Sequence, residues 1–558
     1  MTMRRLAQWT RLLAAAGVLG VAGCKNLDIQ NPNAPDAERA FSDPDAIAGL
    51  VTGGFRNWML THESYNGSLL LSTMADAHTA SWNNFNIRYY SSVGNECPVR
   101  CGWANSNTSS FRFQIETYWY GYYSVLSSAN DVLTAIRNNG VVIGSAANTR
   151  VVEFGAALLQ AMVLSEIALN YDQGFVVDED TDLTTLELVP RSEVRDAAIA
   201  KFDAAIAIAG TNFSSPAEWT GVVNGTAYTS AQWIKLARTM QARLLAYYPR
   251  TAAENGTVNW GQVTTYASQG LSSGTPNDLQ FYQDFNVLFS GIKNWSNDLT
   301  TMRVDTRLAA IIAPPQVHPW PEAAGGNPQP NSPDHRVGNG TWGPEDDFLG
   351  VGTLAEDAGA GTDYAYAGIP IFLPARGQYH QSNLGQIRYS FTAYPGYGLP
   401  GEDGTGQFPV LTATMNDLLW AEGLVRSGGS AATAATLINK TRVGRGNLAA
   451  ATAGEGTASL LTKVQYEQDI ELLGIGASPY YNRRRIDGLQ AMTPRHMPVP
   501  AKELLILRLE LYSFGGPGNP AGLAPPTTPD GRVVRTVRQQ WAEIMAHEKQ
   551  QARSRSRG

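Results

Sequence analysis

Residues 409–446 constrain the fold most strongly, because their pattern predicts a complete helix, a tight turn and a second helix. Apolar residues recur at three- and four-residue spacing in the first half, and Gly428 and Gly429 interrupt the run. Ser430 can cap the second helix, which is expected to end at Gly444. One helical hairpin cannot bury its apolar face alone, so the chain must supply further helices to pack against it.

The same spacing recurs on both sides of this hairpin and predicts roughly eight substantial helices in all. Besides the two of the hairpin, the substantial helices are expected over 45–58, 113–137, 149–169, 192–209, 230–247 and 459–473. Shorter helical stretches are expected over 69–77 and 260–269, and a final amphipathic helix over 533–549. Most of them form adjacent pairs joined by short links, as is typical of a scaffold of repeated helical pairs. We therefore expect a mainly helical fold.

The segment from about 271 to 412 breaks this pattern. It is rich in Gly, Pro and Asn and contains many aromatic residues, which makes it too aromatic for plain disorder. We expect it to form a large irregular, loop-rich lobe beside the helical scaffold.

The first 24 residues have the composition of an export signal. Positive residues, Arg4 and Arg5 among them, accompany an apolar run over 12–21, and the small residues before Cys24 are similar to a bacterial lipobox. In such a motif the cysteine is acylated and becomes the new N-terminus. We expect residues 1–23 to be a lipoprotein signal peptide and Cys24 to carry a lipid anchor.

Lipidation of Cys24 leaves Cys97 and Cys101 as a pair in the sequence ECPVRC. Outside the cytoplasm a small disulfide loop is the simplest interpretation of such a pair. A metal site is the alternative, but two thiols without a nearby histidine or a second pair offer few ligands. The formal net charge of −7 argues against a nucleic acid partner, because binding to phosphates requires a positive surface.

Two further motifs have a functional and a structural interpretation. The acidic run over 178–182 could wrap Ca²⁺, but it lacks the glycine and glutamate of an EF-hand loop at Leu183 and Val189. We expect a solvated acidic loop and no cofactor, with calcium as the alternative. The stretch 270–274 matches G-x-S-x-G, but it follows a predicted helix where a nucleophile elbow needs a strand, so we interpret it as a helix stop.

Taken in order, several short segments resemble the SusD/RagB family of outer-membrane nutrient-binding lipoproteins. These segments are the lipobox with LDIQNPNAPD, NYDQGFVV with the following VPRSEVRDAAIAKFDAAI, VDTRL, PVLTATMNDLLWAEGLVRSG, LINKTRVGRG and MPVPAKEL. They are similar to the family's start, its Tyr-Gly-Asp loop and following helix, its Asp-Pro-Arg-Leu element, its Tyr-Ala-Glu helix, its repeat helix and its closing Pro-Ile-Pro segment. The family's Phe-Asp-Leu-Arg-Arg run appears only as residues 481–485, and the tail after Leu511 has no counterpart.

The resemblance implies a tetratricopeptide-like scaffold of about four helical repeats carrying the irregular lobe. It places one SusD-like domain over 24–512 and leaves 513–558 as a linker, a short helix and a basic tail. It also implies an outer-membrane protein, lipid-anchored and facing the cell surface, that covers a TonB-dependent barrel transporter of the SusC type. Such a protein captures an oligosaccharide or a peptide and passes it inward without chemistry.

Sugar recognition needs flat apolar faces for the rings and a few directed polar groups for the hydroxyls. Glycan-binding members of the family place an aromatic arc with Asn, Asp and Arg in the region that corresponds here to residues 76–88. The resemblance therefore implies ligand-binding roles for Asp76, Trp82, Asn84, Arg88, Trp295 and Trp320. The structural alternative is that these rings cover the core of the scaffold.

Three other functions remain as alternatives to carbohydrate capture. A peptide-binding member of the same family would use the same scaffold without ring-stacking aromatics. A glycoside hydrolase would need a pair of carboxylates whose separation is spatial and is not read from a sequence. A bare scaffold would bind only protein partners.

Overall fold

The structure, a computed structural model, describes residues 43–80, 87, 104–210, 212–272, 278–283, 288–296, 302–318, 331–341, 363–366, 382–386, 388 and 406–515. The predicted signal peptide, the predicted acylation site Cys24, the cysteine pair Cys97 and Cys101 and most of the C-terminal tail lie outside these residues. The predicted domain boundaries stay predictions.

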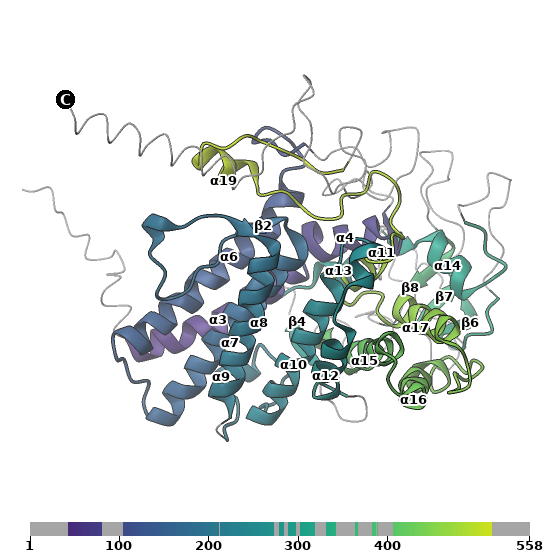
Figure 1. The fold of residues 1–558 in the computed structure, drawn as a ribbon, viewed down its shortest axis with the longest axis horizontal. Helices are drawn as coiled ribbons and strands as arrows, with labels where there is room; N and C mark the ends of the chain where they lie inside the picture. The colour runs from purple at the N-terminus through teal and green to yellow at the C-terminus, as the bar shows by residue number, and fades with distance from the viewer. Residues whose placement is uncertain are drawn as a thin grey trace, which may run out of the picture.

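Helices dominate the described residues (Figure 1). They are α3 (Pro44–His62), η1 (Tyr65–Leu69), α4 (Leu70–Met74), α6 (Phe113–Leu133), η3 (Thr134–Asn138), α7 (Ala146–Asn170), η4 (Leu183–Thr185), α8 (Arg191–Ala209), α9 (Ala217–Thr220), α10 (Ser230–Tyr247), α11 (Ala252–Gly256), α12 (Trp260–Ser268), α13 (Gly291–Ser296), α14 (Thr306–Ile312), α15 (Ala413–Ser427), α16 (Ala431–Arg442), α17 (Thr457–Glu471), α18 (Ser478–Arg484) and α19 (Ala501–Ile506). The predicted mainly helical fold class is confirmed.

The strands are short. They are β1 (His78–Ala80), β2 (Gln173–Gly174), β3 (Val189–Pro190), β4 (Leu279–Gln283), β5 (Met302–Val304), β6 (Val337–Thr341), β7 (Tyr364–Tyr366), β8 (Leu384–Gln386) and β9 (Gly406–Leu411). The pairs β1–β5, β2–β3 and β4–β9 are antiparallel, and β6, β7 and β8 form one small sheet. The pairs β1–β5 and β4–β9 join segments that are far apart in the sequence.

The hairpin predicted over 409–446 is present as α15 and α16. Thr412 caps α15, because its Oγ1 accepts a hydrogen bond from the backbone amide of Met415 at 3.0 Å. Gly428 ends α15 with φ of 73°, a left-handed conformation that glycine adopts without strain. Ser430 caps α16 through the amide of Thr433 at 3.1 Å, as expected.

Helices α3, α6, α7, α8 and α10 lie together in one part of the fold (Figure 1). Their apolar faces enclose an aromatic core. Phe55 lies 5.2 Å from Trp219 and 5.6 Å from Trp233 between ring centroids, and Phe154 lies 5.8 Å from Trp233. These rings are at most 1% exposed. The apolar residues whose spacing predicted the helices therefore lie on the helix faces that meet in this core.

Helix α7 is long and apolar enough to cross a membrane by length and composition alone. Within the fold, 94% of its most apolar window is buried inside the protein. A helix that is hydrophobic nearly all round is expected at the centre of a large core, and α7 has that position between α6 and α8.

Several sequence-based details were incomplete. The first helix begins one residue before the predicted range and is capped by Asp43, whose carboxylate accepts from the amides of Asp45 and Ala46. The segment 271–412, predicted to be irregular and rich in loops, contains the helices α13 and α14. Residues 409–411 belong to strand β9, and α18 was not predicted, because seven residues carry too little periodicity.

Candidate functional site

The loop predicted to bind ligand starts on a fixed base at Asp76, which is 2% exposed. The Asp76 carboxylate accepts a hydrogen bond from Gln490 Nε2 at 2.7 Å and pairs with Arg483 Nη2 at 3.3 Å. The Asp76 carbonyl oxygen accepts another from Arg307 Nε at 3.0 Å. Asp76 therefore positions the start of the loop, and its direct contact with a ligand stays a prediction.

The next residues tie this base to the lobe. Strand β1 pairs with β5, and the His78 ring lies 2.8 Å from Ser72 Oγ and 2.9 Å from Gln386 Oε1. Burial lowers the pKa of His78 to about 4, although the hydrogen bond to Gln386 opposes this shift. A neutral ring is therefore held between α4 and β8, and Thr79 Oγ1 donates to Asp305 Oδ2 at 2.8 Å.

Ile87 connects the predicted loop with α13. It is fully buried and belongs to one apolar cluster with Leu69, Ile292 of α13 and Met302 of β5. Helix α13 is fixed in turn by Lys293, whose Nζ lies 2.7 Å from Glu63 Oε2 with both side chains fully buried. Ile87, the residue that precedes Arg88, therefore shares an apolar cluster with the helix that carries Trp295.

The other predicted binding residues cannot be placed in this way. Trp82, Asn84, Arg88 and Trp320 lie outside the described residues, and for Trp295 only the backbone, in α13, is described. Their roles stay predictions.

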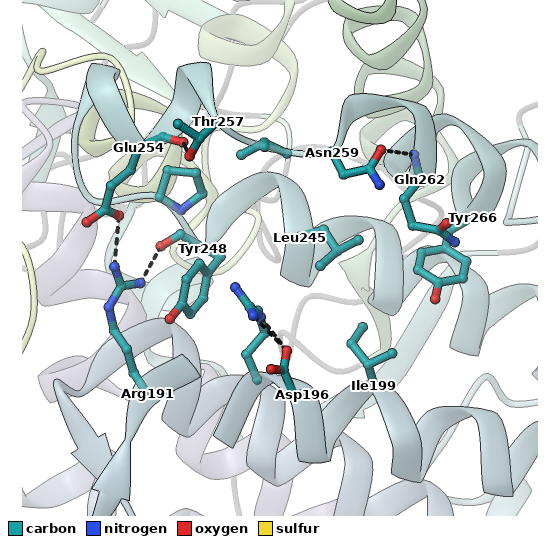
Figure 2. A pocket seen from close by; sticks show the side chains of 13 residues that line it. Arg191, Asp196, Ile199, Leu245, Tyr248, Glu254, Thr257, Asn259, Gln262 and Tyr266 are labelled. Carbon is teal, nitrogen blue, oxygen red and sulfur yellow. Dashed lines mark hydrogen bonds and ion pairs between the residues drawn. The ribbon is translucent and has the colours of Figure 1, made fainter. Parts of the chain in front are cut away.

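A pocket of about 520 Å³ lies elsewhere, on the helical scaffold itself (Figure 2). Helix α8 forms one wall, the end of α10 forms the floor, and α11, α12 and the turn between them form the other wall. The lining side chains are Arg191, Arg195, Asp196, Ile199, Leu245, Tyr248, Pro249, Glu254, Thr257, Val258, Asn259, Gln262 and Tyr266.

One end of the pocket is organised around the ring of Tyr248. The guanidinium carbons of Arg191 and Arg195 lie 4.0 Å and 4.6 Å from the ring centroid, which is cation–π distance. Arg191 also donates to the Tyr248 carbonyl oxygen at 2.9 Å and pairs with Glu254 Oε2 at 2.8 Å. Burial raises the pKa of Glu254, but the charge of Arg191 and hydrogen bonds from Arg250 and Arg191 outweigh this, so the pKa is lowered and Glu254 is ionised.

The middle and the far end of the pocket are less charged. Ile199 and Leu245 face the space between the walls, and Figure 2 shows Gln262 and Tyr266 beyond them. Asn259 caps α12 by accepting from the amide of Gln262 at 3.0 Å. The pocket thus combines an apolar centre with polar groups at both ends, the composition usual for small-molecule sites.

Sequence reasoning assigned no role to any residue of this pocket. A signal was present, because Arg191, Arg195 and Ile199 follow at intervals of four and must share one face of α8. The opposite wall could not be inferred, because the fold of 248–260 into a short helix and two turns has no clear periodicity.

Two carboxylates of the acidic run 178–182 are paired with basic side chains. Asp178 Oδ2 lies 3.0 Å from Lys201 Nζ, and Glu179 Oε1 lies 2.5 Å from Arg137 Nη1. No group of three or more His, Cys, Asp and Glu residues within the described part of the chain is arranged to hold a metal ion. Residues 270–272 follow α12, so the strand that a nucleophile elbow requires does not precede them.

No protein-family model matches the sequence, and no curated protein is significantly similar to it. Solved structures do match the fold. A SusD-like carbohydrate binding protein from Bacteroides fragilis superposes with a TM-score of 0.52 at 14% identity, covering 88% of this chain and 93% of its own. A SusD superfamily protein from Bacteroides vulgatus gives 0.51 at 14% identity, covering 83% and 97%. Another from Bacteroides fragilis gives 0.52 at 12% identity, covering 84% and 98%.

At these identities the likeness concerns the fold, and it extends over nearly the whole length of each matched structure. It agrees with the order of segments that suggested the same family from the sequence. The chain has the fold of the SusD-like proteins.

Proposed function

We propose that this chain is a lipid-anchored outer-membrane protein that captures oligosaccharides and delivers them to a TonB-dependent barrel transporter of the SusC type. The observation that carries the proposal is the SusD-like fold, together with a solved neighbour that is described as carbohydrate binding. The lipobox before Cys24 supports the anchor, and we propose that the protein faces the cell surface.

The described base of the predicted loop supports the binding role. Asp76, β1 and Ile87 fix the chain on both sides of Trp82 and Asn84, and Ile87 packs against α13. A recognition loop held at both ends loses less conformational entropy when it binds a ligand. We propose that Trp82, Asn84, Arg88, Trp295 and Trp320 contact the sugar, and that the protein performs no chemistry on it.

Calorimetric titration tests the proposal. The full-length chain in detergent is titrated with plant, algal and microbial oligosaccharides and, separately, with mixed peptides. We expect saturable heat with an oligosaccharide and no release of reducing ends. Binding of peptides alone would replace carbohydrate with peptide as the ligand, and turnover that one carboxylate substitution abolishes would identify a hydrolase.

Localisation and partner need their own tests. The wild-type chain is expected in the outer-membrane fraction, and Cys24→Ser is expected to be released from it, because one cysteine carries the acyl anchor. Crosslinking in cells should join the wild-type chain to a barrel transporter. Recovery of Cys24→Ser in the same membrane fraction would contradict the anchor.

A further inference from the structure

The pocket between α8 and α12 is separate from the predicted binding loop. All its lining residues lie between 191 and 266, whereas the base of the loop is built from β1, β5, α13 and α18. Its volume of about 520 Å³ falls within the range of small-molecule pockets, roughly 300–1,000 Å³. The pocket therefore has room for a ligand of its own.

The charged groups of the pocket occur as neighbouring donors and acceptors. Arg191 pairs with Glu254 at 2.8 Å, and Arg195 pairs with Asp196 at 2.7 Å, so the four charges cancel. An anion would have to displace a carboxylate from its arginine, and a cation would face two guanidiniums. A neutral ligand is favoured if its groups both donate and accept hydrogen bonds, as hydroxyl groups do.

The two ion pairs differ in how readily they could meet a ligand. Backbone groups hold the first pair: Arg191, 16% exposed, donates to the Tyr248 carbonyl oxygen, and Glu254, 42% exposed, accepts from the Arg250 amide at 2.8 Å. Arg195, 28% exposed, lies over the Tyr248 ring and pairs with Asp196, which is 66% exposed. Arg191 and Glu254 thus form a fixed wall. Arg195 and Asp196 form an adjustable rim that can turn toward adjacent hydroxyl groups.

The remaining lining residues offer apolar surface for the C–H groups of such a ligand. Ile199, Leu245 and Val258 are apolar and half-buried, and the ring of Tyr266 stands at the end opposite Tyr248 (Figure 2). Aromatic and aliphatic surfaces stack on the C–H faces of sugar rings, and the Gln262 amide beside Tyr266 offers further polar contacts. A hydroxyl-rich ring with one apolar face fits this combination better than a purely polar or purely apolar molecule.

We propose that the pocket between α8 and α12 is a second binding site that takes a neutral saccharide unit. The assignment of a saccharide rests on the function proposed above, while the position and the chemistry of the pocket come from its own residues. A second site on the scaffold would hold another part of a long glycan, or a second copy of a short one, away from the predicted loop.

Hydrogen exchange with and without ligand tests this proposal on the full-length chain. The probes are neutral xylo-, cello- and malto-oligosaccharides, with glutamate-rich peptides as the comparison. We expect an oligosaccharide to slow exchange in 191–199 and 245–266, and to do so also in Trp82→Ala. Slower exchange only around 76–88 and 291–296 would overturn the second site and leave the proposed function intact.

Two other outcomes would also overturn the proposal. Slower exchange in 191–199 and 245–266 with the peptides but not with oligosaccharides would refute a neutral saccharide as ligand. No change anywhere with any oligosaccharide would remove the proposed function and the second site together.

Matched variants sharpen the result. Tyr266→Ala is expected to weaken binding at the pocket roughly tenfold, the usual effect of losing one aromatic contact. Gln262→Ala should weaken it about fivefold, as expected for one neutral hydrogen bond, whereas Gln269→Ala, an exposed amide at the end of the same helix, should leave it unchanged. Equal effects of Gln262→Ala and Gln269→Ala would contradict a ligand seated in the pocket.

Discussion

Two parts of this molecule are held together by different physics. The N-terminal helices meet in an aromatic core where Phe55, Phe154, Trp219 and Trp233 are at most 1% exposed. The irregular lobe joins the C-terminal helices through fully buried charges around Arg336. Packing of the aromatic rings depends on shape and apolar surface, although α7 and α10 also share the buried pair of Glu166 and Arg243 at 2.7 Å. The junction depends on each buried charge meeting its partner.

The junction around Arg336 is built from three buried carboxylates. The Arg336 guanidinium donates to Asp334 at 2.7 Å, to Glu467 at 2.7 Å and to Glu471 at 2.7 Å, and all four side chains are fully buried. Arg388 adds a bond of 2.8 Å to Glu471. Since Arg336 and Arg388 belong to the lobe and both glutamates to α17, this cluster attaches the lobe to the scaffold.

A buried charge cluster fixes how the two segments that meet there are placed, but it tolerates substitutions less well than an apolar core does. An apolar core adapts to a changed side chain by partial repacking. A buried carboxylate that loses its arginine has no substitute partner and must either be solvated or take up a proton. Mutations at the junction should therefore be more damaging and more dependent on pH than mutations in the aromatic core.

Arg336→Met should have the largest effect. It removes the closest cation of the buried Asp334 and Glu467, while Glu471 keeps Arg388 and Arg445. Breaking such pairs costs roughly 3–5 kcal/mol of the free energy of unfolding. Urea denaturation at pH 7 measures the loss, and the exposed Arg150→Met serves as the control. The deficit should shrink as the pH is lowered, because protonation removes the unpaired negative charges. A loss below about 1 kcal/mol would contradict the comparison.

Glu422→Gln should rank second. Glu422 is buried, and although burial opposes it, the charge of Arg485, hydrogen bonds from Arg485 and the charge of Arg426 lower its pKa to about 2. Its contribution is present above the ordinary pKa near 4.5 and is lost as pH falls toward 2. We expect a loss of about 2–3 kcal/mol at pH 7 and a flatter stability curve between pH 4.5 and 2. Identical acid curves for both chains would refute this.

Asp172→Asn should have the third-largest effect. The contribution of Asp172 to stability falls as the pH rises, whereas that of Glu422 falls as the pH is lowered. Burial raises the pKa of Asp172 to about 6, although hydrogen bonds from Gln173 and Tyr512 oppose the shift. Such a group contributes stability below its ordinary pKa, and this contribution is lost as pH rises through about 6. Thermal unfolding from pH 4 to 7 should show a change of roughly 1–2 kcal/mol in the wild type, smaller in the variant. Parallel curves would mean that this carboxyl is already solvated.

Phe154→Leu should have the smallest effect on stability. The ring lies in the aromatic core, 5.2 Å from Phe213 and 5.8 Å from Trp233. Replacement by another large apolar residue should cost about 1 kcal/mol, and the cost should be the same at pH 5 and pH 7. Urea denaturation at both values checks it. A strong pH dependence here would remove the distinction between the two parts.

The same contrast explains what the sequence could predict. The helices were predicted because their apolar faces repeat every three to four residues, and the α15–α16 hairpin was predicted down to its Gly428 stop and Ser430 cap. The Arg336 cluster was not, because its partners Glu467 and Glu471 lie 131 and 135 residues away and no local pattern marks them.

The candidate sites followed the same rule. The loop after Asp76 was identified from the resemblance, while its buried pairs with Arg483 and Gln490, more than 400 residues away, had no local signal. The pocket between α8 and α12 was missed, although the stripe of Arg191, Arg195 and Ile199 marked one of its walls. Both sites are formed by tertiary contacts between segments that have no local sequence pattern in common.

The central claim is that the loop held on the Asp76 base captures saccharide, and binding by Trp82→Ala tests it most directly. The measurement is oligosaccharide affinity by calorimetry together with the melting temperature of the same full-length sample. We predict a loss of roughly 1–3 kcal/mol in binding free energy, the effect of one aromatic contact, with a nearly unchanged melting temperature. Unchanged affinity, or a large fall in melting temperature, would contradict the claim.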